Sequence, residues 1–195
     1  MAAELDGVLR CVVFNPSARE RGPVVDLDPE GVKQALLVTA YGGFCVGQAA
    51  AQAMLENGGH GGSILFTGAS ASYKGYANSS SFAMGKFGLH GLAQSMAREL
   101  GPQGIHVAHF PIDGGVGTID YSTGEKNAHW SRYGAVTADA ERLARAPPGA
   151  GGDGLDDGDT MLGPDAIAEA YLFVHRQHRS AWTFEMVLRP WVETW

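Results

Sequence analysis

The sequence predicts an α/β fold in which helices pack on a parallel, doubly wound β-sheet. The stretch 62–118 carries most of this prediction, because two apolar runs, 63–70 and 105–110, flank a helical stretch, 81–100. Two strands joined by one helix form a βαβ crossover, which is the connection that parallel strands require. The upstream run 8–14 adds a third observation, since strands buried on both faces of a parallel sheet read as continuous hydrophobic residues.

Composition limits the class of protein. The chain has 195 residues, of which 45% are hydrophobic, so it can form one domain with a buried core. Its formal net charge of −7 argues against a nucleic-acid or membrane partner. The sequence shows no signal-peptide pattern and no run of ~20 apolar residues. We therefore expect a soluble intracellular protein, in the cytoplasm or an organelle matrix.

The two cysteines indicate the redox environment. Cys11 and Cys45 lie in apolar runs and lack the spacing of metal ligands. Buried thiols of this kind are typical of a reducing compartment.

The first strand, 8–14, is followed by a long predicted helix. Asp28 and Glu30 flank a proline where this helix begins, as the helix dipole favours, and the helix runs to about Asn57. Its middle, 41–51, is rich in small apolar residues, which let another helix approach closely.

The strand 63–70 leads through a Ser/Gly/Tyr-rich loop into the helix 81–100. Apolar residues of this helix recur at three- and four-residue spacing: Leu89, Leu92, Ala93, Met96, Ala97 and Leu100. A Gly/Pro stop at 101–104 precedes the strand 105–110. Since ligands of open α/β sheets bind beyond the carboxyl ends of strands, the predicted site is the loop after 63–70 and the first turn of the helix.

The last third of the chain is less regular. Residues 119–161 predict a variable loop region, and its GxGxxG motif at 149–154 follows no strand, so we interpret it as a flexible loop. A helix at 164–174 begins with proline, and 180–188 predict a final strand. His175 and His178 fit helix-dipole partners better than metal ligands, and no metal site is predicted.

Several phrases, in order along the chain, resemble the short-chain dehydrogenase/reductase family. They are 62–72, 82–89, 97–107 and 113–118, and 12–18 resembles the family strand that ends in Asn-Ala-Gly. The resemblance implies an incomplete Rossmann-like fold, the second half of the family's fold. It also implies a single truncated domain over 1–195 with a substrate lid at 119–161.

The same resemblance implies an activity. Members are NAD- or NADP-linked oxidoreductases of alcohol and carbonyl substrates. By position, the cofactor-binding residues would be Asn15, Lys86 and Thr118.

The catalytic positions depart from the family's pattern. The family uses Tyr-x-x-x-Lys, with a serine before the tyrosine and an asparagine on the preceding helix. Here Lys86 is kept, but Phe82 stands at the tyrosine position, Ala69 at the serine and Thr39 at the asparagine. Reduction of a carbonyl needs a proton at its oxygen, which a benzyl side chain cannot give. Loss of a general acid removes about 10²–10⁴-fold of rate, so the sequence predicts an impaired enzyme or a pseudoenzyme.

Alternatives stay open at two positions. Ser70 or Ser72 would replace the missing serine hydroxyl if the loop is shifted. Lys86 would be a ribose ligand, a cation resting near the Phe82 ring, or an exposed lysine without a role.

The resemblance also predicts what is missing and what would cover the gap. In the family, an opening segment beside the strand 8–14 carries the Gly-rich turn that receives the dinucleotide pyrophosphate. We find no counterpart here, so cofactor binding by this chain alone is not expected, unless the sequence is a fragment of a longer chain. An open strand edge invites association, so we expect a homo-oligomer or another chain to cover 8–14.

A second function follows from the same features. The family pairs subunits through the two helices described above, and their Gly/Ala-rich faces fit that use, although two helices packed tightly on their own sheet would show the same composition. The alternative is therefore a non-catalytic structural or assembly subunit that dimerises through its helices.

Overall fold

The computed structural model describes residues 7–56, 61–117, 162–190 and 193. Their contacts divide the chain into two compact units, residues 1–112 with 173–187, and residues 113–172 with 188–195. The predicted lid at 119–161, its GxGxxG motif and Thr118 lie outside the described residues. The single domain over 1–195 stays a prediction.

The first unit contains the predicted α/β sheet. Strands β1 (Cys11–Phe14), β2 (Gly62–Thr67) and β3 (Ile105–Phe110) are parallel and lie in the order β1-β2-β3. In register, Ile64 of β2 pairs with Val12 on one side and Val107 on the other. This confirms the predicted crossover, with β2 in the middle and β1 at the edge of the described sheet.

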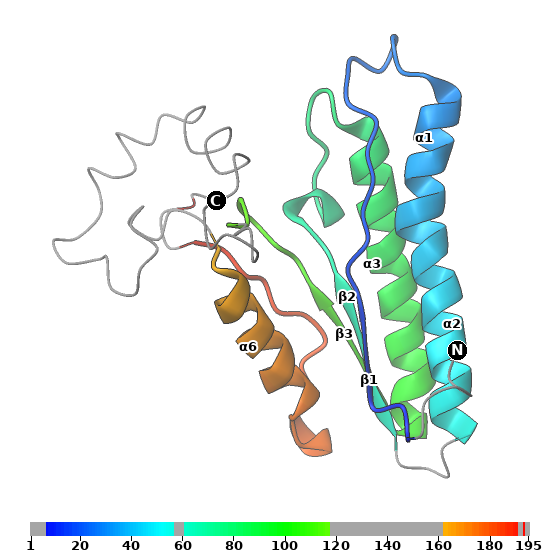
Figure 1. The fold of residues 1–195 in the computed structure, drawn as a ribbon, viewed down its shortest axis with the longest axis vertical. Helices are drawn as coiled ribbons and strands as arrows, with labels where there is room; N and C mark the ends of the chain where they lie inside the picture. Colours follow the sequence, from blue (N-terminus) through cyan, green and yellow to red (C-terminus); the bar gives the residue numbers. More distant parts are fainter. Residues whose placement is uncertain (1–6, 57–60, 118–161, 191–192, 194–195) are drawn as a thin grey trace, which may run out of the picture. The chain divides into compact units, whose positions relative to one another are not determined.

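Two helical rods cover one face of this sheet (Figure 1). One is α3 (Ser80–Leu100), at its predicted place. The other consists of α1 (Pro29–Leu36), a π-helical turn (Leu37–Tyr41) and α2 (Gly42–Glu56), where the sequence predicts an uninterrupted helix. The Asp28 carboxylate caps the start by accepting hydrogen bonds from the backbone N–H groups of Glu30 and Gly31, at 3.3 and 3.0 Å.

The core of the unit lies between the sheet and these helices. Phe14, Ile64, Phe66 and Val107 of the strands are buried there with residues of α2 and α3. Glycine allows α2 to come close: a Cβ added to Gly47 would lie 2.9 Å from the sulfur of Met96 and 3.1 Å from the ring of Phe66. The small apolar residues of this helix therefore serve close packing, as predicted.

Two predictions about this unit are wrong. Cys11 and Cys45 are free but exposed, because Cys11 begins the edge strand and Cys45 lies on the outer side of α2. The expected strand 180–188 is reduced to isolated bridge positions at Glu185, which pairs with His109, and at Leu188. Its first two residues belong instead to a 3-10 turn, Arg179–Ala181.

The second unit is described only in part. Val116 and Leu162 form a parallel bridge, and Arg189 forms an ion pair with Asp113 at 3.3 Å. Helix α6 (Pro164–His175) begins at the predicted proline; its first residues belong to this unit and its last three to the first unit. No helix among the described residues is long and apolar enough to cross a membrane.

Candidate functional site

Helix α3 places Phe82 and Lys86 one turn apart at the carboxyl end of β2. The Lys86 ammonium donates a hydrogen bond to the backbone carbonyl of Thr67 at 2.7 Å and lies 5.9 Å from the centre of the Phe82 ring. The guanidinium of Arg19 lies 4.9 Å from the same ring centre. Lys86 is 2% exposed, which rules out the reading of an exposed lysine. Two cations therefore lie near the Phe82 ring, which occupies the position of the family's tyrosine.

Burial has a direct electrostatic consequence for Lys86. Loss of solvation lowers the pKa of its ammonium to about 8. Below pH 8 the folded protein carries this buried charge and its full cost. Between pH 8 and the ordinary pKa of 10.5, the unfolded chain binds more protons than the folded one, so stability rises with pH in that range.

We expect Lys86→Met to remove this pH dependence. Relative to the variant, the free energy of unfolding of the wild type should rise by about 3 kcal/mol from pH 7 to above pH 10, since one pKa unit corresponds to about 1.4 kcal/mol. Urea denaturation at a series of pH values measures the difference. Lys33→Met, at a solvent-exposed ion pair with Glu30, is the matched control and should track the wild type. Parallel curves for wild type and Lys86→Met would show that Lys86 is not desolvated.

The other predicted site residues lie around this pair. Thr39, in the π-helical turn, is buried, and its hydroxyl accepts a hydrogen bond from the Ala18 backbone N–H at 3.0 Å. It packs against α3, because a Cβ added to Gly85 would lie 3.0 Å from the Thr39 Cβ. Asn15 directly follows β1 and is exposed at the carboxyl end of the strand. The structure thus brings Thr39 to the turn of α3 that holds Phe82 and Lys86.

The serine candidates have other partners. The hydroxyl of Ser70 accepts a hydrogen bond from the Tyr76 hydroxyl at 2.8 Å. Ser72 is buried, and its hydroxyl oxygen accepts from the Ala69 backbone N–H at 3.2 Å and lies 3.4 Å from His109 Nε2. Position 69 itself offers only a methyl group. Both serine hydroxyls form hydrogen bonds within the loop that follows β2.

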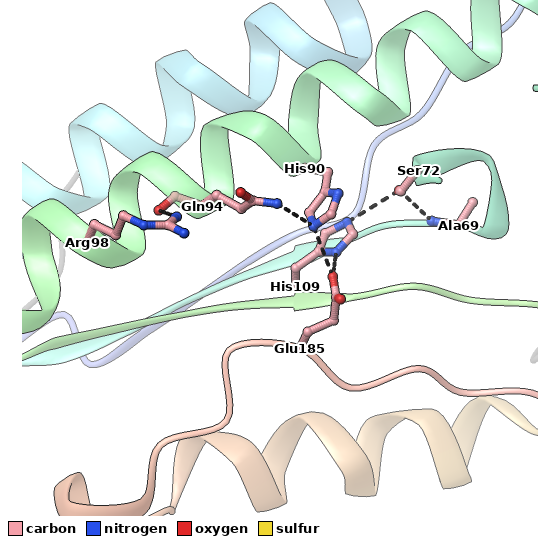
Figure 2. A network of polar contacts seen from close by, with 7 residues as sticks. All are labelled: Ala69, Ser72, His90, Gln94, Arg98, His109 and Glu185. Atoms are coloured by element: carbon pink, nitrogen blue, oxygen red, sulfur yellow. Dashed lines mark hydrogen bonds and ion pairs between the residues drawn. The ribbon is translucent and has the colours of Figure 1, made fainter. Parts of the chain in front are cut away.

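A second polar cluster lies on the sheet face beneath α3, and sequence reasoning missed it (Figure 2). Because side chains alternate along a strand, His109 shares the face of Ile105 and Val107, which pack in the core. The backbone N–H of His109 donates to Phe184 and its carbonyl accepts from Met186, at 2.8 and 3.1 Å. This register sets Glu185 directly opposite His109.

The side chains of this cluster converge on one carboxylate oxygen. Glu185 Oε1 lies 2.8 Å from His109 Nδ1 and 3.1 Å from His90 Nε2. The two imidazole rings stack, with centres 4.6 Å apart and planes 13° apart. Tyr73 also bonds to Glu185, and its ring packs edge-on against His90 at 5.1 Å.

These contacts shift three pKa values. Burial lowers the pKa of His109 to about 4, although the Glu185 hydrogen bond acts in the opposite direction. Burial is the main cause that raises the pKa of Tyr73 above its usual value, and the hydrogen bond to Glu185 acts in the same direction. Burial would raise the pKa of Glu185, but hydrogen bonds from Tyr73 and His109 outweigh it and hold that pKa low. At neutral pH the cluster thus contains a neutral His109 and an ionised carboxylate.

Comparison with known proteins identifies the family. The family model described as Enoyl-(Acyl carrier protein) reductase, of the short-chain dehydrogenase group, matches residues 2–112. The chain belongs to the short-chain dehydrogenase/reductase family. This confirms the resemblance seen in the sequence, and the parallel sheet is a fragment of that family's Rossmann-like fold.

Individual relatives of this short-chain dehydrogenase/reductase chain include characterised enzymes. Trans-4-hydroxycyclohexanecarboxylate dehydrogenase of Sinomonas cyclohexanicum is 33% identical over 106 residues, which cover 54% of this chain and 40% of that protein. The (3R)-3-hydroxyacyl-CoA dehydrogenase of Rattus norvegicus is 37% identical over 82 residues, 42% of this chain and 31% of that protein. The chain therefore spans less than half the length of these curated relatives.

Solved structures agree on the fold. A short-chain dehydrogenase from Rhodopseudomonas palustris has a TM-score of 0.66 and 32% identity, covering 94% of this chain and 63% of that one. A 4-hydroxyisoleucine dehydrogenase complexed with NADH has the same TM-score of 0.66 at 19% identity, covering 92% of this chain and 67% of that one. The second likeness concerns the fold alone.

Proposed function

We propose that this chain forms the catalytic-helix half of a nicotinamide-linked oxidoreductase of alcohol or carbonyl substrates, and that its chemistry is impaired as written. The observation that carries the proposal is the pair on α3. Lys86 is buried at the end of β2 with its ammonium on the Thr67 carbonyl, while the neighbouring ring at Phe82 has no proton to transfer. The scaffold is that of an oxidoreductase, and its general acid is absent.

The residues present fit one end of a dinucleotide. An ammonium has three N–H donors, and the bond to Thr67 uses one, so Lys86 keeps donors for the hydroxyls of a nicotinamide ribose. Asn15 lies at the carboxyl end of the neighbouring strand. Bound there, NAD or NADP would supply the hydride, and these residues would hold its nicotinamide end.

The described residues offer no site for the pyrophosphate of the dinucleotide. Within 7–56, 61–117 and 162–190, no glycine-rich turn leads from a strand into the N-terminus of an α-helix, which is where a pyrophosphate binds. We therefore propose that tight cofactor binding requires structure beyond these residues, joined at the β1 edge.

Titration of the purified chain with NADH and with NADPH, followed by nucleotide fluorescence, tests this proposal. We expect no saturation below millimolar concentration. Saturable micromolar binding that disappears in Lys86→Met would show a complete cofactor site and overturn the proposed impairment of binding.

A second candidate function is a non-catalytic assembly subunit. It is favoured by large apolar side chains exposed along the two helical rods: Leu37, Val38, Tyr41, Phe44, Val46, Met84 and Phe87. The rings of Tyr41 and Phe44 stack on each other at 6.2 Å. Large apolar side chains exposed on helices favour an interface, and we propose that a second copy of the chain covers them.

Sedimentation velocity tests the helical interface. We expect the wild type to dimerise and Phe44→Lys to be a monomer, because a lysine at the centre of a buried apolar interface is strongly unfavourable. Val24→Lys places the same charge on an exposed valine outside the helices and should remain dimeric. A dimeric Phe44→Lys protein would exclude this surface.

A further inference from the structure

We propose that His90, His109 and Glu185 form a binding site for a divalent transition-metal ion of the zinc class. The three residues, called here the His90–His109–Glu185 cluster, come from α3, from β3 and from the segment paired with β3. Each offers one ligand atom, and these atoms all lie within 4.8 Å of one another. Three separate elements thus direct their donor atoms to one point (Figure 2).

The spacing is close to that of a coordination sphere. Zinc–nitrogen and zinc–oxygen bonds of about 2.0–2.1 Å put neighbouring ligand atoms of a tetrahedral site about 3.3 Å apart. The two carboxylate–imidazole distances here are 2.8 and 3.1 Å. The carboxylate is therefore at ligand spacing from each imidazole, while the two imidazole nitrogens, which lie within 4.8 Å of each other, would have to come closer to share an ion.

Glu185 accepts a hydrogen bond from His109 Nδ1 at 2.8 Å, so the ring proton of the neutral imidazole lies on the atom that would bind the ion. His109 Nε2 lies 3.4 Å from the Ser72 hydroxyl oxygen and can take up that proton when the tautomer changes. The ion would therefore replace the proton between His109 and Glu185, because a histidine ligand must present a lone pair. At the other ring, His90 Nε2 lies 3.1 Å from Glu185 Oε1 and 3.1 Å from the side-chain amide nitrogen of Gln94, which would have to move away.

The surroundings suit a site with an open position. His109 is buried, whereas the side chains of His90 and Glu185 are 14% and 29% exposed, so solvent reaches the cluster from one side. The Tyr73 hydroxyl bonds to Glu185 and orients it. Two imidazoles and one carboxylate, with water in the fourth position, form a ligand set that zinc accepts.

Such an ion would tie the segment around Glu185 to β3 and α3. In the described structure that segment joins β3 through a single bridge, so the ion would add the cross-link that a longer strand pairing would otherwise give. Binding to the folded state alone raises its stability. Metal binding at this cluster would require neither a bound cofactor nor turnover.

The experiment is zinc titration of tag-free, EDTA-treated protein by calorimetry, with thermal unfolding as a second measurement. All proteins carry Cys11→Ser and Cys45→Ser, because both thiols are exposed and would bind zinc themselves. We expect one zinc ion per chain and a higher Tm with zinc. Cobalt(II) should give the intense visible absorption of a four-coordinate site.

Variants separate this cluster from other ligands. His90→Gln and Glu185→Gln should each weaken zinc binding by about 100-fold or more and abolish the Tm rise. His178→Gln and Glu169→Gln make the same exchanges at exposed positions and should bind as the parent does. The unfolding transition without metal verifies that each variant is folded. No saturable micromolar binding by the parent, or unchanged binding by the folded His90→Gln and Glu185→Gln variants, would overturn the proposal.

Discussion

Phe82→Tyr is expected to raise carbonyl reduction by about 10²–10⁴-fold over the wild type, the usual contribution of a positioned general acid. The phenol would project from the ring whose centre lies 5.9 Å from the Lys86 ammonium and 4.9 Å from the Arg19 guanidinium. Nearby cations favour the phenolate and so lower the pKa of a phenol. The phenol at position 82 would therefore release its proton more readily to the oxygen of a carbonyl substrate.

The measurement is NADH and NADPH oxidation at millimolar cofactor against a panel of ketones and aldehydes. Phe87→Tyr is the matched control, since it adds the same hydroxyl to an exposed ring on the same helix and should leave the rate unchanged. Lys86→Met introduced into Phe82→Tyr should remove the gain. A folded Phe82→Tyr protein with no gain in rate would favour the assembly-subunit function.

Gly61→Ala is expected to destabilise the first unit by about 2–4 kcal/mol. Gly61 has a φ of +63°, in the left-handed region that favours glycine. It directly precedes β2, whose first residue pairs with Ile105. An added Cβ would collide with the backbone carbonyl oxygen of Gly104, which cannot turn aside as a flexible side chain can.

Urea denaturation followed by circular dichroism measures this loss. Gly91→Ala is the control, because Gly91 lies in α3 with open space around the added Cβ. Alanine has the higher helix propensity, so this variant should gain about 0.5–1 kcal/mol. Equal stabilities for the two variants would mean that β2 and the turn before β3 do not meet as described.

The parts of the fold that were predicted correctly have local signals. The helix Ser80–Leu100 shows its apolar stripe and its Gly/Pro stop, and β2 and β3 are mostly apolar runs. The errors come from tertiary context. The π-helical turn at Leu37–Tyr41 has no composition of its own, and the exposure of Cys11 depends on which strands flank β1.

The two polar clusters also differ in whether the sequence alone predicts them. Phe82 and Lys86 are four residues apart on one helix, so their proximity follows from spacing alone. His109 and Glu185 are brought together by strand register, and no property of either segment fixes that register in advance. The run 105–110 contains two histidines, His106 and His109, which indicate polar partners without identifying them.

Transfer of deuterium from 4-deuterated NADH or NADPH to a carbonyl substrate, measured by mass spectrometry, tests most directly whether the wild-type chain lacks a working general acid. We expect product deuteration at the level of the protein-free reaction for the wild type, and above it for Phe82→Tyr. Deuterated alcohol formed by the wild type at the rate of Phe82→Tyr, and lost in Lys86→Met, would contradict the account, because a proton donor other than residue 82 would then be at work.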